Sequence, residues 1–364
     1  MASIEKRNGK YRVRFRDPIG RPRSKTFARK ADADRFAREV EVDKDRGSWI
    51  DPRKSEISLQ AWSEAFLASS LSLAPTSLAT YRRDLERYVL PTLGDRRLSR
   101  LNAEEIEHWL GTELARGISP SSVHRHYRTL RRVLQSAVEK DRLLANPCAK
   151  VRPPRVPTRP MAILTWSQSV ALAEAHPEHL KPMIYLALDS GMRWSELVGL
   201  RRGQVDLARR KVRVTEQLLR VDGAWLRRPT RTAAGIRSIT ISASTADMLE
   251  RHLEDWAIGK DKDQLVFTTT TGTPLQHSSF QTNTWKKALA AAGVKCRFHD
   301  LRHTSVALAI ASGAHPKAIQ VRMGHSTISV TLDRYGHLFP ELDEAIAVAF
   351  DQRWTEARAA AGVA

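Results

Sequence analysis

The amino-terminal stretch alternates between hydrophobic and charged positions. In YRVRFR, one face of a strand would carry Tyr11, Val13 and Phe15, and the other Arg12, Arg14 and Arg16. Prolines and a glycine over residues 18–22 indicate a turn, followed by a second strand over 24–27 and a helix over 31–46. We therefore predict a small β-sheet packed with one helix.

From about residue 57 the apolar positions recur at helical spacing. Four helices are expected within residues 57–145, at 59–70, 76–94, 102–117 and 119–143. Thr76 is the candidate cap of the second helix, and Asn102, with Glu105 three residues later, that of the third. The spacing alone does not distinguish this set from other helical bundles.

Residues 147–160 read PCAKVRPPRVPTRP, which neither a helix nor a central strand accommodates. We expect a semi-rigid, extended basic linker here. Beyond it, helical patterns enclose short alternating segments over 211–217, 225–230 and 237–242. The expected fold is mainly α and multidomain with small β-sheets, divided into residues 1–56, 57–146, the linker 147–160, and 161–364.

The charge balance indicates a polyanionic partner. Sixty Lys and Arg against forty Asp and Glu give a formal net charge of +20, more than solubility requires. The arginine face of YRVRFR suits a DNA groove, although charged residues also protect edge strands. The helix over 119–143 adds the candidate DNA contacts Arg125, Arg128, Arg131 and Arg132.

Cysteine is scarce, and neither Cys148 nor Cys296 has a zinc-ligand spacing. This favours a reduced, cytoplasmic location, and we expect no metal and no cofactor. The charged amino terminus does not resemble a signal peptide, and no apolar run is long enough for a membrane helix.

Three patterns in the last domain carry candidate chemistry. They are SGMRWSELVGL with Arg193, FHDLRHTSVALAIASG with His299 and Arg302, and MGHSTISVTLDRYGHL with His325 and Tyr335. Each is weak alone, but their order and spacing together resemble the tyrosine recombinase, or phage integrase, family. The resemblance implies a mixed α/β catalytic domain preceded by a four-helix SAM-like core-site-binding domain. The basic amino-terminal unit is similar to the arm-site-binding domain of the family's long members.

The resemblance also implies roles that the residue types can fulfil. Arg193 and Arg302 would hold the phosphate oxygens as charge develops, and Tyr335 would attack phosphorus to form a phosphotyrosine ester. In the family, the position of His299 acts as general base and that of His325 bonds the phosphate. Glu196 and Asp300 are expected to support these side chains. Such an arginine clamp has no strict need for a metal.

One position departs from the family pattern. A hairpin lysine usually protonates the leaving 5′ oxygen, but RPTRTAAGIRSITIS places Arg231 there, with Arg237 following as a DNA contact. Arginine is a poor proton donor. Three readings stay open: Arg231 substitutes in part, Lys211 reaches the site, or cleavage is slow.

We therefore predict a site-specific recombinase that integrates or excises a mobile element through a 3′-phosphotyrosyl intermediate. The expected partners are double-stranded DNA attachment sites, with the protein as a homotetramer and a DNA-bending accessory protein left open. A non-catalytic architectural protein with a decayed site is the main alternative. A type IB topoisomerase-like enzyme shares the chemistry but needs no arm-binding domain.

Overall fold

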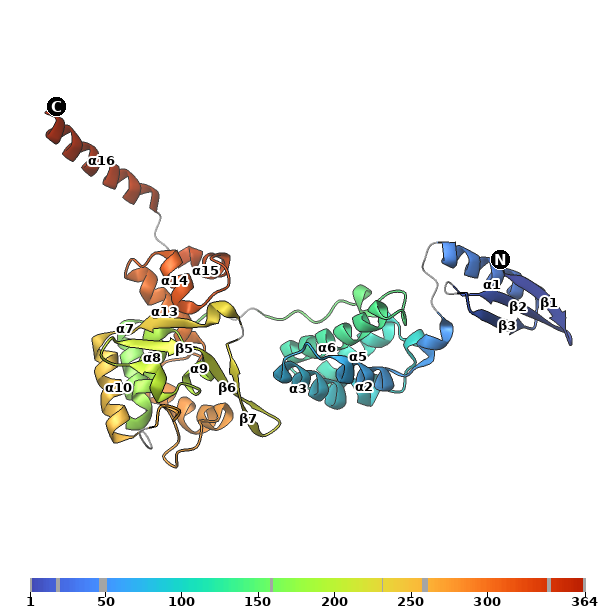
Figure 1. Ribbon diagram of the computed structural model, residues 1–364, viewed down its shortest axis with the longest axis horizontal. Coiled ribbons are helices and arrows are strands. Elements are labelled where there is room, and N and C mark those ends of the chain that lie inside the picture. The colour runs from blue at the N-terminus through green and yellow to red at the C-terminus, as the bar shows by residue number, and fades with distance from the viewer. Residues whose placement is uncertain are drawn as a thin grey trace. The chain divides into compact units, whose positions relative to one another are not determined.

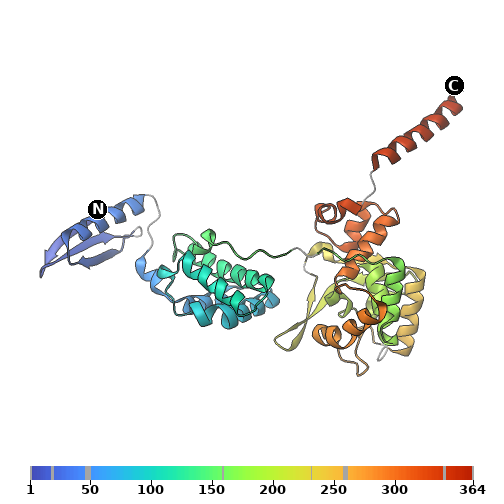
Figure 2. The same cartoon turned by 180° about the vertical axis from the view of Figure 1, so that it is seen from behind.

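The computed structural model describes residues 2–17, 20–45, 51–157, 160–230, 232–256, 261–338 and 342–362. The chain forms two compact units, Met1–Thr158 and Arg159–Ala364. Helices predominate in both units, as the two views of the ribbon show (Figures 1 and 2). The described strands form two three-stranded sheets and one two-stranded sheet. The predicted fold class, mainly α with small β-sheets, is confirmed.

The first unit begins with an antiparallel sheet whose central strand carries the alternating arginines. Its elements are β1 (Ser3–Arg7), β2 (Lys10–Arg16), β3 (Pro22–Phe27) and the helix α1 (Lys30–Asp45). Val13 and Phe15 are buried with Ala33 and Val40 of α1, as the alternation predicts. Strand β1 was not predicted, because SIEKR has a single apolar residue, Ile4, which lies opposite Val13.

The rest of this unit is a helical bundle. Its elements are η1 (Pro52–Glu56), α2 (Leu59–Ser69), α3 (Pro75–Asp84), a π-turn (Leu85–Val89), α4 (Leu90–Leu93), η3 (Leu98–Arg100), α5 (Ala103–Ala115), α6 (Pro120–Glu139) and η4 (Pro147–Lys150). The Asn102 side chain accepts a hydrogen bond from the Glu105 N–H at 2.9 Å, which confirms it as a cap. The cap assigned to Thr76 is wrong: Pro75 occupies the first turn, where its missing N–H costs nothing, so the helix begins earlier.

The second unit surrounds a large hydrophobic core. Between Lys150 and Trp166 the described residues form neither helix nor strand. The helices are α7 (Trp166–Glu174), η5 (Glu178–Leu180), α8 (Lys181–Ser190), α9 (Trp194–Leu197), η6 (Arg202–Gln204), η7 (Ala233–Gly235), α10 (Ala243–Asp255), α11 (His277–Phe280), η8 (Gln281–Trp285), α12 (Lys286–Ala292), α13 (Asp300–Ala311), α14 (Pro316–Met323), α15 (Ser329–Tyr335), η9 (Gly336–Leu338) and α16 (Leu342–Ala361). The strands are β4 (Val205–Asp206), β5 (Lys211–Val214), β6 (Glu216–Val221), β7 (Ala224–Pro229) and β8 (Arg237–Thr240).

A separate small core fixes the last helices before α16. Val306 and Ile310 of α13 pack with Ile319 and Met323 of α14 and with Tyr335 at the end of α15. The candidate nucleophile is therefore held by the packing of three helices.

Candidate active site

Arg193 is held at the start of a short helix by the acid that follows one turn later. Its backbone N–H donates to Glu196 Oε2 at 2.9 Å, and its guanidinium donates to Glu196 Oε1 at 2.8 Å. The Arg193 side chain keeps 41% of its surface exposed, whereas that of Glu196 keeps 3%. The carboxylate thus orients a guanidinium that still faces solvent, as the three-residue spacing predicts.

Arg237, which we expected to contact DNA, is instead buried with only 7% of its surface exposed. Its Nη2 donates to Glu196 Oε2 at 2.9 Å, and its Nε donates to the carbonyl of Arg322 at 2.8 Å. Burial alone would raise the pKa of Glu196, but Arg237 and Arg193 lower it below its usual value. Arg237 therefore lies in the protein interior, where it keeps Glu196 ionised and fixes the position of its carboxylate.

Arg302 is the second guanidinium, and it lies deeper in the unit. It donates to the carbonyls of Gly191 at 2.6 Å and Met323 at 2.5 Å, and 4% of its surface is exposed. Burial, together with the charges of Arg193 and Arg237, lowers its pKa to about 9, so it stays protonated at neutral pH. The two carbonyls fix its plane, which suits a group that must meet an anion in one geometry.

His299 and His325 stand near both arginines. His325 Nδ1 lies 2.8 Å from Thr331 Oγ1. Burial and then the charges of Arg302 and Arg193 lower the His325 pKa to about 4. For His299, burial is the largest cause, followed by His303 and the arginines, and its pKa is also about 4. Both imidazoles are therefore neutral at physiological pH and can accept or donate a hydrogen bond.

Tyr335 is buried, with 1% of its surface exposed, and its hydroxyl has a partner that sequence reasoning missed. His303 Nδ1 lies 2.5 Å from the Tyr335 hydroxyl oxygen, and His303 is itself 5% exposed. Burial raises the Tyr335 pKa, while Arg302 and Arg334 oppose the shift. The available signal was the position of His303, directly after Arg302 and four residues after His299, on the same face of a helix.

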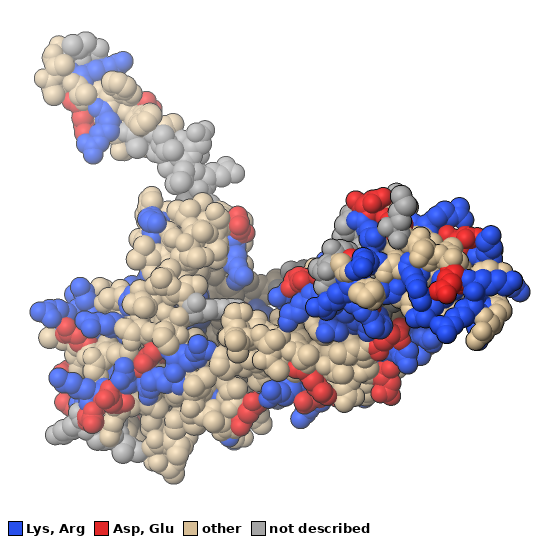
Figure 3. All heavy atoms as spheres, turned by 45° about the vertical axis from the view of Figure 1, so that its right-hand side comes forward, with Lys and Arg blue, Asp and Glu red and all other residues tan. Residues whose placement is uncertain are grey.

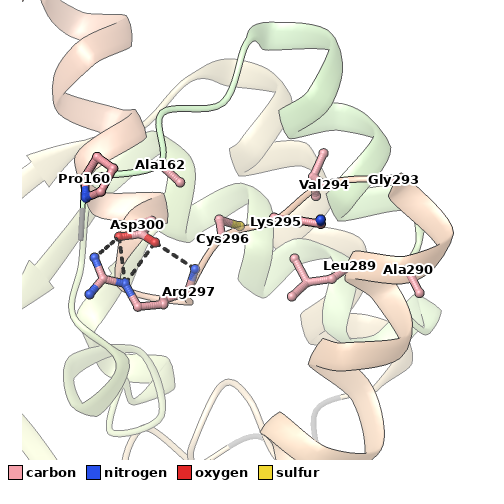
Figure 4. A pocket seen from close by; sticks show the side chains of 10 residues that line it. All are labelled: Pro160, Ala162, Leu289, Ala290, Gly293, Val294, Lys295, Cys296, Arg297 and Asp300. Atoms are coloured by element: carbon pink, nitrogen blue, oxygen red, sulfur yellow. Dashed lines mark hydrogen bonds and ion pairs between the residues drawn. The ribbon is translucent and has the colours of Figure 1, made fainter. Parts of the chain in front are cut away.

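Asp300 anchors the start of α13. Asp300 and Arg297 both line a cavity of about 670 Å³. Figure 4 shows the two side chains next to each other. The Arg297 guanidinium donates to Asp300 Oδ1 at 2.7 Å and its backbone N–H donates to Oδ2 at 2.8 Å. This double contact fixes the turn from which His299, Arg302 and His303 project, which agrees with the supporting role expected for Asp300.

The remaining predicted residues lie on surfaces. Arg14 and Arg16 are exposed on β2, and Arg12 donates to Ser24 Oγ at 2.9 Å. Figure 3 shows Lys and Arg side chains over much of the visible face of the amino-terminal sheet and α1 (Figure 3). Four arginines are exposed along α6, namely Arg125, Arg128, Arg131 and Arg132. Lys211 is exposed on β5, and Arg231 lies outside the described residues.

Within the described ranges, no three His, Cys, Asp or Glu side chains gather as ligands for a metal ion. Of the helices that the structure describes, none combines the length and apolar character that a membrane span requires.

Such a set of groups suits chemistry at a phosphodiester. Two fixed guanidiniums can stabilise charge on phosphate oxygens, neutral imidazoles can move protons, and a phenol can act as a nucleophile.

Comparison with known proteins agrees with this chemistry. Residues 162–341 match the model of the phage integrase family, and residues 59–153 match that of the phage integrase central domain. The integrase of Mycobacterium phage D29 is 26% identical, over 94% of this chain and 93% of its own.

Two solved structures share the fold. A chain of the Tn1549 transposon integrase in complex with a circular intermediate DNA has a TM-score of 0.67 at 20% identity. The alignment covers 82% of this chain and 99% of that one. A chain of the lambda integrase tetramer bound to a Holliday junction has a TM-score of 0.57 at 18% identity, covering 93% and 95%. This chain belongs to the phage integrase family: it is a tyrosine recombinase that acts on DNA.

Proposed function

We propose that Tyr335 attacks the scissile phosphate of an attachment site and forms a 3′-phosphotyrosyl ester, releasing the 5′ oxygen. Arg193 and Arg302 bind the non-bridging oxygens, His325 donates a hydrogen bond to the same phosphate, and His299 assists proton transfer. The ester conserves the energy of the broken bond, so religation to a new 5′ end needs no nucleotide cofactor. Integration or excision of a mobile element follows from two such exchanges.

One observation carries this proposal. The segments that carry Arg193, Arg302 with His299, and His325 with Tyr335 are far apart in the sequence, yet side-chain contacts join them. Arg302 donates to the carbonyls of Gly191 at 2.6 Å and Met323 at 2.5 Å, each two residues before Arg193 and His325 respectively. His303, next to Arg302, lies 2.5 Å from the Tyr335 hydroxyl oxygen and contacts the ring of His299. These contacts support a single site that contains all five residues.

We further propose how the chain is divided among its DNA contacts. Residues 1–56 bind arm-type sites through Arg12, Arg14 and Arg16, and residues 57–146 bind the core site through the arginines of α6. Residues 147–160 link these to the catalytic domain, 161–364. The lambda relative is a tetramer on a Holliday junction, which supports a homotetramer here. A DNA-bending partner would act on the arm sites.

The test is a covalent adduct. The full chain is incubated with nicked duplexes whose sequence is taken from the DNA that flanks the coding sequence. A denaturing gel then separates the protein–DNA adduct from free protein and free DNA. The parent protein should trap an adduct, and Tyr335→Phe, which keeps the ring, should trap none. An adduct that persists in Tyr335→Phe would exclude Tyr335 as the nucleophile. Folded, DNA-binding parent protein that forms no adduct would favour an architectural protein.

Arg231 is proposed to donate a hydrogen bond to the leaving 5′ oxygen in place of the family's lysine. Arg231→Lys should raise the rate of adduct formation, because an ammonium group can also release a proton, and Arg231→Ala should lower it. Equal rates in the parent and both variants would leave Arg231 without a role in cleavage.

A further inference from the structure

The hydroxyl of Tyr335 meets His303, a residue to which neither the family resemblance nor the expected mechanism gives a role. The phenol oxygen and His303 Nδ1 are 2.5 Å apart, and both residues are buried. Among the hydrogen bonds of the described residues, His303 is the only side-chain partner of this hydroxyl. His299, the residue in the position of the family's general base, contacts His303 instead, with ring centroids 5.1 Å apart in an edge-to-face arrangement.

We propose that His303 accepts the hydroxyl proton of Tyr335 as the phenol oxygen attacks the phosphorus. His299 then acts through its ring contact with His303 and not directly on the hydroxyl. This inference rests on the proposed role of Tyr335. In the step, the Tyr335 O–H bond breaks and its proton moves to His303 Nδ1, while the Oη–P bond forms and the P–O5′ bond breaks. The 5′ oxygen leaves with that bonding pair and takes its proton from water or a side-chain acid. On religation the imidazolium returns its proton to Tyr335.

The surroundings of His303 suit a base that is neutral at rest and is protonated only during the attack of Tyr335. Burial lowers the pKa of His303 most, and Arg334, Arg297 and Arg302 act in the same direction, so the ring is neutral at pH 7. Nδ1 can then accept the hydroxyl hydrogen, provided that the ring proton is on Nε2.

Asp300 provides the opposing charge. It lies one helical turn before His303 and favours the imidazolium. Its own position is fixed by Arg297, with two guanidinium nitrogens and a backbone N–H within 3.2 Å of its oxygens. The imidazolium that forms during attack is therefore stabilised by a carboxylate that does not itself need to move.

The experiment compares His303→Asn with His299→Asn. An asparagine oxygen can replace Nδ1 as a hydrogen-bond acceptor, but it cannot take up a proton at neutral pH. Single-turnover adduct formation on the nicked duplex is measured from pH 5 to 9, beside DNA affinity and the melting temperature. A second duplex carries sulfur at the 5′ bridging position, because a thiolate leaves without needing a proton.

We expect His303→Asn to slow adduct formation by roughly 10²-fold or more on both duplexes, with unchanged DNA affinity. The rate of the parent should level off once His303 is neutral, whereas the rate of this variant should keep rising with pH up to 9, as solvent hydroxide replaces the missing base. His299→Asn should lose less rate than His303→Asn on both duplexes.

Three results would overturn the inference while leaving Tyr335 as the nucleophile. One is parent-like cleavage by His303→Asn, and another is a larger loss in His299→Asn. The third is full rescue of His303→Asn by the sulfur duplex, which would assign His303 to the leaving group. An adduct in Tyr335→Phe would instead remove the proposed function itself.

A second measurement does not depend on the folding of a histidine variant. In protein labelled with ¹⁵N histidine, one neutral ring should carry its proton on Nε2 and show an Nδ1 resonance that shifts in Tyr335→Phe. Protonation of that ring at Nδ1 at neutral pH would contradict the inference, because the lone pair would then be unable to accept the hydroxyl hydrogen.

Discussion

At the scale of single residues, Glu196 supports two arginines at once. Its oxygens accept from Arg193 at 2.8 Å and from Arg237 at 2.9 Å, and the pair with Arg237 is 3% exposed on both sides. Removal of Arg237 would leave the buried Glu196 carboxylate paired with the partly exposed Arg193 alone. We expect Arg237→Ala to lower the free energy of unfolding by about 3 kcal/mol in urea denaturation.

The double variant separates this effect from simple truncation. Glu196→Ala combined with Arg237→Ala should cost less than the sum of the two single changes, because neither charge is then left alone. Additive losses would show that the two side chains do not depend on each other. Arg209→Ala, at a guanidinium that is 78% exposed beside Asp206, is the control and should change stability little.

The lowered pKa values of two histidines predict that the protein becomes less stable toward acid pH. His299 and His325 have pKa values of about 4 in the folded protein and an ordinary value of 6.5 when unfolded. Below pH 6.5 the unfolded chain therefore binds more protons, and stability falls as the pH drops from 6.5 to 4. His325→Asn should flatten this decline, whereas His337→Asn, at an exposed position, should not.

The order and spacing of residue types, through the family resemblance, predicted Arg193, His299, Arg302, His325 and Tyr335 as the site. Two features were beyond such reasoning. The spacing of HDLRH places His299 and His303 on one helix face but does not show which ring meets the phenol. Arginines near a hairpin also look alike in sequence, and only packing against Glu196 and the Arg322 carbonyl turns Arg237 inward.

At the scale of elements, the tight junction after α14 depends on a glycine. Gly324 has φ +65°, and a Cβ there would lie 2.7 Å from the Ala234 carbonyl oxygen. Gly313 has φ +77° with no atom within 4 Å of the same position. Gly313→Ala should therefore cost roughly 1–2 kcal/mol for the backbone alone, and Gly324→Ala distinctly more.

The rate of DNA cleavage should also distinguish the two glycine variants. The Gly324→Ala clash lies between η7 and the loop that carries His325, so we expect slower adduct formation as well as a lower melting temperature. Gly313→Ala should keep the parent rate. Equal losses of stability in the two variants would mean that the junction yields to the added methyl group.

The carboxy-terminal helix α16 exposes hydrophobic side chains. Val348, Phe350 and Trp354 are 53%, 62% and 65% exposed. The sequence predicts a stripe of Leu342, Ile346, Ala349 and Phe350 on this helix. The family resemblance implies packing of such a helix on a neighbouring protomer, and packing on its own domain is the equal alternative. The side chains of the first three lie outside the described residues.

We predict that Phe350→Ala with Trp354→Ala weakens tetramer formation on DNA by roughly tenfold or more, because buried aromatic anchors dominate interfaces. Analytical ultracentrifugation with the nicked duplex measures this. Arg358→Ala, on the same helix, is the control. If the double variant assembles normally but melts earlier, α16 packs on its own domain instead.

Element patterns were predictable where burial has a clear period. Strand β2 and the helices from α2 to α6 follow their apolar spacing, because one face of each meets a core. Strand β1 escaped prediction because hydrogen bonding to β2 supports it in place of an apolar face. The start of α3 was missed because proline geometry outweighed a threonine cap.

At the scale of the whole molecule, the basic charge predicts salt-dependent binding. The logarithm of DNA affinity should fall linearly with that of salt concentration, with a slope of about 0.9 for each phosphate contacted. Replacing Arg14 and Arg16 with Gln should lower that slope by about 2 if both meet phosphates. Fluorescence anisotropy measures it, with Arg209→Gln as the control, and an unchanged slope would mean that this strand face does not touch DNA.

The absence of helix and strand around residues 152–157 has a consequence for how weak sites combine. A linker between two binding modules turns the second of two binding events into an intramolecular one, with an effective concentration set by the length and stiffness of the linker. Two modest affinities then multiply into strong retention. If both halves bind DNA as proposed, either one would be able to release it briefly while the other stays bound, so strands would be exchanged without loss of the substrate.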